Sequence, residues 1–281
     1  MKIRFMGTAA CEGIPAMFCD CDVCRRAMQK GGKNIMTRSQ ALVDEELLID
    51  FASDTYMHFL QAGKTMYRVR DVLITHTHED HLVVSDFGNR HPGSSYGLKY
   101  PRLNMYVGEG SEQILERERV ACKVYGGGGF EEDYNVVPVK KFETFAVGDY
   151  QVTAFPARHA MNENALLFLI EKDGRALFYG NDTGYFDESI DLWLAENNKK
   201  IDLLALDCTK GDLEQDYYTH MSMSEGARIA DRFRKKGIID QNTKLYYNHF
   251  SHNCKNCYDE LVEKAKKYGF AVTYDGLEVE V

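Results

Sequence analysis

The stretch His76-Thr77-His78-Glu79-Asp80-His81 follows the apolar run Val72-Leu73-Ile74 and guides the interpretation of the whole chain. It places three imidazoles and two carboxylates within six residues, a density that is costly unless a cation binds there. Imidazole nitrogens and carboxylate oxygens are suitable ligands for Zn, Mn or Fe. The alternate spacing lets His76 and His78 bind one ion while Asp80 and His81 bind another. The stretch therefore predicts a hydrolase site with two catalytic divalent metals.

The composition is that of a globular protein with a large core. With 281 residues and 44% hydrophobic content, we expect one domain over residues 1–281. No apolar run approaches the roughly 18 residues needed to span a membrane. The first residues alternate like a strand and do not resemble a signal peptide, so we expect a cytoplasmic protein with no membrane partner. The eight cysteines are then better interpreted as thiols than as disulfides.

The net charge of −9 bears on the class of substrate. It opposes long, nonspecific contacts with a nucleic-acid backbone, which makes extended nucleic acid an unfavourable partner. A small anionic substrate held by metals fits this charge better.

Short apolar strands alternate with helical segments along the chain. We expect strands at residues 3–6, 41–43, 47–49, 72–75, 103–107, 150–155, 165–170, 176–179, 203–206 and 245–247. We expect helices at residues 54–62, 111–120, 187–196, 222–236 and 258–268. This order favours an α/β (α+β) protein in which two strand-rich halves pack face to face with helices outside.

Further candidate ligands recur at the ends of apolar strands. His159 follows the strand at 152–155, Asp182 follows the run at 177–181, and His249 follows the run at 245–248. Side chains just past buried strands converge on one edge of a sheet. A site with two ions needs more ligands than one loop supplies, and these three residues are the candidates. His58, inside an expected helix, has no such context and is interpreted as structural.

In order and context these residues resemble the metal-ligand set of the metallo-β-lactamase superfamily. The resemblance implies a four-layer αββα sandwich in which His76, His78 and His159 bind one metal and Asp80, His81 and His249 bind the other. It also implies that Asp182 bridges the two metals and that Asp50 supports the site without ligating. An aspartate at position 182 is unlike the true lactamases, which have cysteine there. His78 is unlike the flavodiiron oxidoreductases, which have glutamate.

A second cluster, Cys19-Asp20-Cys21-Asp22-Val23-Cys24, places three thiols at a spacing that suits three corners of a tetrahedral zinc. The N-terminal loop that carries it, residues 11–24, resembles the PhnP group of cyclic phosphodiesterases. That resemblance implies a structural zinc completed by His252, three residues after His249. The chain departs from the pattern by adding Cys254 and Cys257, either of which could replace or supplement His252. The added pair could also be redox-active, because it precedes an expected helix.

A phosphodiester hydrolase also needs a proton donor for the leaving alkoxide. Two metals about 3.5 to 4 Å apart can activate water and polarise a phosphoryl oxygen, but they do not supply this proton. His220, in Thr219-His220-Met221-Ser222, resembles the family histidine that contacts the phosphate and assists the leaving group. Asp80 is a candidate proton shuttle as well as a ligand.

The leading hypothesis is a metal-dependent phosphodiesterase acting on a small, cyclic phosphodiester. Its first alternative is a ribonuclease of the tRNA 3′-processing type, which uses a similar dinuclear site but for which no basic RNA-binding arm is evident. A second alternative is a nonhydrolytic metalloprotein like the PqqB group. Dimers are common among these relatives, so a homodimer is compatible with the sequence.

Overall fold

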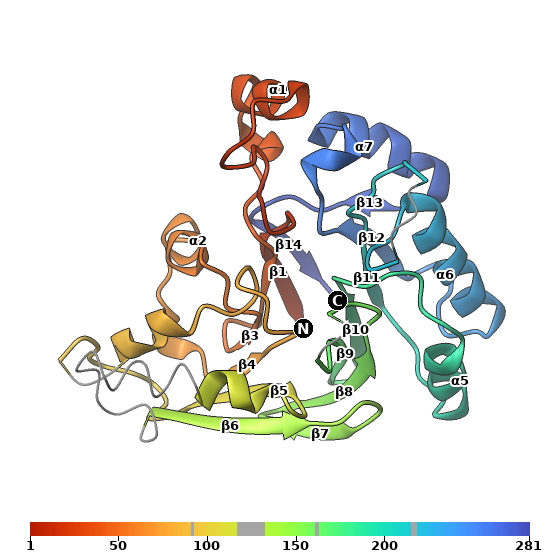
Figure 1. The fold of residues 1–281 in the computed structure, drawn as a ribbon. Helices are drawn as coiled ribbons and strands as arrows, with labels where there is room; N and C mark the ends of the chain where they lie inside the picture. Colours follow the sequence, from red (N-terminus) through yellow and green to blue (C-terminus); the bar gives the residue numbers. More distant parts are fainter. Residues whose placement is uncertain (91–92, 117–132, 161–162, 215–217) are drawn as a thin grey trace.

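The computed structural model describes residues 1–90, 93–116, 133–160, 163–214 and 218–281. Two seven-stranded sheets face each other (Figure 1). The first has the order β14 (Leu277–Glu280), β1 (Lys2–Gly7), β2 (Gln40–Val43), β3 (Leu47–Ile49), β4 (Asp71–Leu73), β5 (Leu103–Gly108) and β6 (Tyr134–Val139). The second has the order β13 (Ala271–Val272), β12 (Lys244–Asn248), β11 (Leu203–Asp207), β10 (Arg175–Gly180), β9 (Leu166–Lys172), β8 (Tyr150–Pro156) and β7 (Thr144–Val147).

Helices cover the outer faces of the two sheets (Figure 1). The second sheet is covered by α5 (Ser189–Glu196), α6 (Met223–Lys235) and α7 (Tyr258–Ala265), and the first by α2 (Thr55–Gln61). Helix α1 (Asp22–Lys30) lies beside α7. This arrangement is the predicted αββα sandwich, and the fold prediction is confirmed.

Both faces of the central strands are apolar because both are covered. In β9, Leu166, Phe168 and Ile170 point into the core between the sheets, while Leu167 and Leu169 point toward the helices. Successive side chains of a strand point to opposite faces, so a strand buried on both sides is apolar at every position. This explains why the central strands are recognisable from short apolar runs.

The ten expected strands are all present, and each end lies within two residues of its expected position. Four strands were not predicted: β6, β7, β13 and β14. The helix expected from Ser111 is helical over residues 112–116, and its remainder, 117–120, lies outside the described residues. Among the described residues, no helix has the length and apolar character needed to cross a membrane.

His58 is a buried structural residue, and it gives the fold a measurable acid sensitivity. Its side chain is 2% exposed, with Nδ1 2.7 Å from Oε1 of Gln40 and Nε2 2.6 Å from Oγ1 of Thr37. Burial lowers its pKa to about 4. The unfolded chain, with a pKa of about 6.5 at this residue, takes up a proton at a higher pH than the folded chain does.

The free energy of unfolding should therefore fall by about 2 kcal/mol from this residue alone between pH 7 and pH 5. Urea unfolding of the wild type and of His58→Gln at both pH values measures this contribution, because effects elsewhere in the protein are common to both. Parallel pH dependence in the two proteins would show that His58 carries no such linkage.

Candidate metal centres and active site

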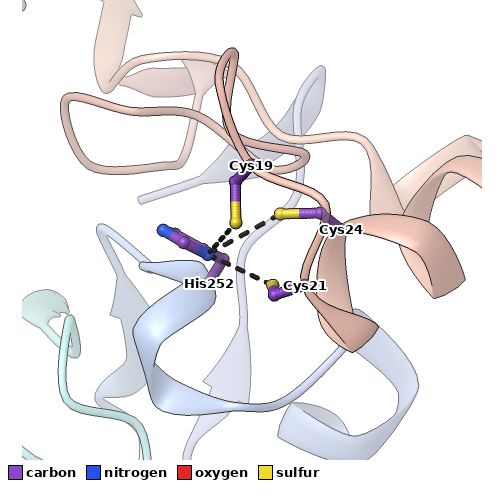
Figure 2. Close-up of side chains that lie close together, drawn as sticks. All are labelled: Cys19, Cys21, Cys24 and His252. Carbon is purple, nitrogen blue, oxygen red and sulfur yellow. Dashed lines mark hydrogen bonds between the residues drawn. The ribbon is translucent and has the colours of Figure 1, made fainter.

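Three cysteine sulfurs and one imidazole nitrogen converge near the start of α1 (Figure 2). Nδ1 of His252 lies 3.6 Å from Sγ of Cys19, 3.4 Å from Sγ of Cys21 and 3.6 Å from Sγ of Cys24. A tetrahedral zinc, with Zn–S of about 2.3 Å and Zn–N of about 2.0 Å, separates a sulfur from a nitrogen by about 3.5 Å. The four side chains therefore fit a closed structural zinc site.

The two additional cysteines lie outside this cluster. Sγ of Cys254 contacts the carbonyl oxygen of Asn256 at 3.9 Å, and Sγ of Cys257 contacts that of Val23 at 3.9 Å. Burial raises the pKa of Cys254 to about 11, which is opposite to the lowered pKa of a redox-active thiol. This geometry favours His252 as the fourth ligand over either cysteine.

The segment that carries the three cysteines is partly helical, whereas a loop is expected over residues 11–24. Helix α1 begins at Asp22, so Cys24 lies in its first turn. Val23, Cys24 and Ala27 form the buried face of this helix. The last three residues of the expected loop thus lie in a helix whose periodicity overlaps the thiol spacing.

Replacing Cys24 with serine should remove zinc from this cluster and lower the melting temperature. The side chain is 2% exposed, and binding of a structural zinc contributes directly to folding. Cys257→Ser is the matched control, since that thiol is 1% exposed in the neighbouring core but lies outside the cluster. Elemental analysis and thermal unfolding of both variants test the assignment. Equal zinc content in the two would contradict it.

The second group of ligand-type side chains lies where parallel strands of both sheets end. Strands β3 and β4 are parallel neighbours in one sheet, and β10, β11 and β12 are parallel neighbours in the other. Asp50, Asp182 and His249 each follow one of these strands with a positive φ, of 64°, 50° and 63°. This left-handed backbone is uncommon outside glycine, is tolerated best by Asp, Asn and His, and is frequent at functional sites. It turns the chain sharply as each strand ends.

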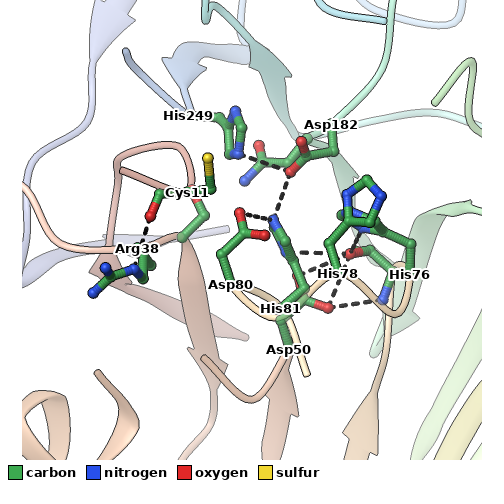
Figure 3. Close-up of polar contacts among 12 residues, drawn as sticks. Cys11, Arg38, Asp50, His76, His78, Asp80, His81, Asp182 and His249 are labelled. Carbon is green, nitrogen blue, oxygen red and sulfur yellow. Dashed lines mark hydrogen bonds and ion pairs between the residues drawn. The ribbon is translucent and has the colours of Figure 1, made fainter. Parts of the chain in front are cut away.

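Three histidines form the first half of this centre, and Figure 3 shows two of them, His76 and His78. Nε2 of His76 lies 2.9 Å from Nδ1 of His78, which lies 3.2 Å from Nε2 of His159. Neighbouring ligands at about 2.0 to 2.1 Å from one ion lie roughly 3 Å apart, so these nitrogens fit a single cation. His159 comes from the connection between β8 and β9, while His76 and His78 follow β4.

The other half contains Asp80, His81 and His249. Nε2 of His81 lies 3.1 Å from Oδ2 of Asp80 and 2.9 Å from Oδ2 of Asp182. Nε2 of His249 lies 2.8 Å from the same Asp182 oxygen. The other oxygen of Asp182, Oδ1, lies 3.7 Å from Nε2 of His159 in the first half. Asp182 thus presents one oxygen to each group of side chains.

Buried polar atoms that lack hydrogen bonds provide a test of whether metals fit. Nε2 of His81, Oδ2 of Asp182 and Nε2 of His249 are fully buried and lack a well-formed hydrogen bond among the described residues. Buried polar atoms without hydrogen bonds are costly, and here the two nitrogens lie 2.9 and 2.8 Å from the same Asp182 oxygen. A divalent cation satisfies all three, so the residues present fit the group that their chemistry implies.

The charges of the centre also favour a bound cation. Burial alone would lower the pKa of His249, but the carboxylate of Asp182 raises it to about 10. Asp182, Asp80 and Asp50 likewise raise the pKa of His81 well above its usual value against the effect of burial. Burial instead lowers the pKa of His76 far below its usual value. The carboxylates therefore draw positive charge to the half formed by His81 and His249.

Further side chains orient the imidazoles of this centre. Oδ2 of Asp50 accepts a hydrogen bond from Nδ1 of His81 at 2.7 Å, while its other oxygen accepts one from the backbone N–H of Thr75. Oγ1 of Thr209 lies 2.8 Å from Nδ1 of His249. Such contacts fix the ring orientation and leave the opposite nitrogen for a metal. Asp50 has the supporting position that the sequence resemblance implies.

His220 lies beside Asp182 and His249, and it is held by a carboxylate that sequence reasoning missed. Nδ1 of His220 lies 3.0 Å from Oδ2 of Asp207, which is fully buried at the end of β11. The other Asp207 oxygen accepts hydrogen bonds from the backbone N–H groups of Thr209 and Met221. The signal was present in the sequence, because Asp207 follows a buried strand as Asp50 and Asp182 do.

Glu163 was also missed, and no sequence pattern marks it. Its carboxylate accepts hydrogen bonds from the backbone N–H of Thr77 at 3.1 Å and from its hydroxyl at 2.9 Å. It also accepts one from Ser111 at 3.1 Å. Glu163 thereby joins the loop that carries His76 and His78 to the loop that carries His159. The partners are 86 residues apart along the chain, a separation that only the fold reveals.

The centre opens into a cavity of about 250 Å³. Both halves of the centre contribute to its lining, together with His220, Cys11, Glu12, Ser251 and Asn253. The zinc-type cluster adjoins this cavity through Glu12, whose carboxylate bonds to Ser251 and lies 3.7 Å from Nε2 of His252. The cysteine cluster thus holds the loop after β12, where His249 also lies.

Comparison with known proteins agrees with this architecture. The family model described as "Beta-lactamase superfamily domain" matches residues 46–242. A curated ribonuclease Z from Acaryochloris marina is 28% identical over 163 residues, which are 57% of this chain and 44% of that protein. The chain therefore spans less than half the length of this curated relative.

Two solved structures resemble the whole fold. A diphosphatase from the PhnP family has a TM-score of 0.76 at 20% identity, over 100% of this chain and 97% of that one. Zn(2+)-bound PqqB from Methylobacterium extorquens has a TM-score of 0.74 at 18% identity, over 100% of both chains. At these identities the likeness shows the fold alone. Because the family model matches well over half of the residues, the chain belongs to the beta-lactamase superfamily.

Proposed function

We propose that the protein is a dinuclear metal-dependent phosphodiesterase acting on a small, cyclic phosphodiester. Superfamily membership and the His/Asp cluster indicate a metal-dependent hydrolase. The observation that carries the finer proposal is the pair of ligand groups that share Asp182, beside a histidine oriented by a buried carboxylate. Acidic net charge and a cavity of about 250 Å³ favour a small anionic substrate over a polymer.

Each residue has a defined task in this proposal. One divalent cation would be held by His76, His78 and His159, and the other by Asp80, His81 and His249. Asp182 would contribute to holding both cations. Zn, Mn or Fe bound there would supply an activated water and neutralise charge on the phosphoryl oxygens. Asp50 and Thr209 orient the imidazoles of His81 and His249.

His220 is the proposed general acid. Because Nδ1 faces Asp207, the opposite nitrogen, Nε2, is the atom from which a proton would pass to the leaving oxygen. The buried carboxylate of Asp207 fixes the orientation of the ring through this contact. Asp80, a member of the second ligand group that also lines the cavity, is proposed as a proton shuttle.

A ribonuclease of the tRNA 3′-processing type is the second candidate, and the match to a ribonuclease Z favours it. The activity of that relative belongs to a longer protein, since the match spans 44% of its length. A nonhydrolytic role like that of the PqqB group would predict no turnover of either substrate class. The three hypotheses can therefore be distinguished by which substrate the protein hydrolyses.

The test is turnover by protein stripped with a chelator and reconstituted with Zn, Mn or Fe, with metal content measured in each sample. Bis(p-nitrophenyl) phosphate and a 2′,3′-cyclic nucleotide should be hydrolysed only by the reconstituted protein. Cleavage of precursor tRNA without turnover of either small diester would favour the ribonuclease. No turnover by fully metallated protein would overturn the proposal of a hydrolase.

A further inference from the structure

A second, larger cavity adjoins the metal centre. It has a volume of about 540 Å³, and its lining includes Ser53, Thr77, Val83 and Ser85. Cys11 and Asp80 line both this cavity and the smaller one at the metal centre. A substrate whose reacting group lies at the centre can therefore extend past Asp80 into this cavity, which we call the side groove.

The side groove leaves the metal centre on a defined side. Cys11 and Arg38 lie on one side of Asp80, whereas His76 and His78 lie on the other (Figure 3). The groove thus adjoins the half of the centre formed by Asp80, His81 and His249.

The walls combine hydroxyl groups with aliphatic surface. Ser53 and Ser85 are exposed, and within the described part of the chain neither hydroxyl has a hydrogen-bond partner. Val83 and Ile114 are half-buried and supply apolar surface in the same groove. Adjacent hydroxyl and aliphatic surfaces suit a ligand with an apolar ring face and several hydroxyls.

The charges of the groove disfavour a second anionic group. Arg38 lines it, but Nη1 of Arg38 donates to both oxygens of Asp54 at 3.0 and 3.1 Å. Nε of Arg38 donates to the carbonyl oxygen of Cys11 at 2.8 Å. The positive charge is therefore balanced, and the carboxylates of Glu79 and Asp80 also line the groove. An uncharged group therefore enters the side groove at a lower electrostatic cost than a phosphate does.

We propose that the side groove binds the nucleoside part of a cyclic nucleotide, without a 5′-phosphate, while the cyclic phosphate lies at the metal centre. This inference rests on the proposed function and narrows its substrate class. Base and sugar would contact the apolar and hydroxyl surfaces, and Arg38 would hold the Cys11 segment in place as part of the wall.

The test fills the groove without touching the metal centre. Ser53→Trp places a large side chain on the exposed wall, and Ser53→Ala is the matched control. For 2′,3′-cyclic AMP, kcat/KM should fall about tenfold or more in Ser53→Trp, mainly through KM, because the lost contacts are binding contacts. For methyl p-nitrophenyl phosphate it should stay within about twofold in both variants. Ser53→Ala removes one hydroxyl but leaves the groove open, so for 2′,3′-cyclic AMP it should lower kcat/KM only about two- to fourfold. Wild type should also prefer 2′,3′-cyclic AMP to its 5′-phosphorylated form.

Binding of adenosine alone, measured by calorimetry, gives a readout independent of turnover. Wild type and Ser53→Ala should bind it, and Ser53→Trp should not. Equal losses for both diesters, or equal adenosine binding by all three proteins, would overturn the groove assignment. Adenosine binding abolished by Ser53→Trp in a protein that hydrolyses no diester would instead overturn the proposed function and leave the nucleoside site standing. Ser85→Trp repeats the test from another position in the groove, in case Ser53→Trp does not fold.

Discussion

Asp182→Asn is expected to lower kcat/KM for a phosphodiester by about a thousandfold or more and to lower bound metal at the centre. The reason is geometric, since each oxygen of Asp182 faces one of the two ligand groups. Asparagine replaces one acceptor oxygen with an NH₂ donor, which cannot ligate a cation. Metal catalysis of this kind supplies several kcal/mol of transition-state stabilisation, which sets the expected loss.

The backbone conformation at position 182 can be kept when aspartate is replaced by asparagine. Asp182 has a φ of 50°, and asparagine tolerates this region nearly as well as aspartate. Asp173→Asn is the matched control, because Asp173 has a φ of 51° but lies exposed in a turn. Metal content, activity and melting temperature should all stay at wild-type values in the control. Retention of full metal and activity by Asp182→Asn would contradict the shared-ligand assignment.

His220→Ala should lower kcat by about a hundredfold to ten-thousandfold, the range of general acid catalysis. Metal content should not change. The loss should be small for a p-nitrophenyl ester, whose leaving group needs little protonation, and large for a cyclic nucleotide, whose leaving group is a sugar alkoxide. This dependence on the leaving group distinguishes a proton donor from a residue that merely shapes the pocket.

His220 also lies near Asp182, Asp207 and His249 in an arrangement that could itself hold a cation. The same variant decides between the two roles, because a ligand would be revealed by loss of metal along with activity. Asp207→Asn provides a graded comparison. It keeps the shape of the buried side chain while weakening the hold on His220 Nδ1, so its activity should lie between wild type and His220→Ala.

The sequence predicts this site well where residue density or strand ends mark it. Cation binding is the simplest explanation of the density of imidazoles and carboxylates between His76 and His81. His159, Asp182 and His249 each follow a recognisable apolar strand. Asp207 has the same signal and was overlooked. Glu163 has none, because its role depends on a contact with Thr77 that local pattern cannot indicate.

The four strands that were not predicted share one physical property. β14 and β6 form the edges of the first sheet, and β13 and β7 the edges of the second. An edge strand has a single neighbour and is partly exposed, as the mixed burial of β7 illustrates. Its apolar periodicity is therefore weaker than that of a central strand. The two sheets were predictable at their centres and not at their margins.

The cysteine cluster has a consequence for biosynthesis. Cys24, the nearest of its three sulfurs along the chain, precedes His252 by 228 residues. At about 5 to 20 residues per second, a ribosome needs roughly 10 to 50 seconds to add the intervening chain. During that interval the three thiols are already made, but their fourth partner does not yet exist. A tetrahedral site at this position can close only after His252 has been added, so metal loading here follows synthesis of the whole His/Asp centre, whose last side chain along the chain is His249.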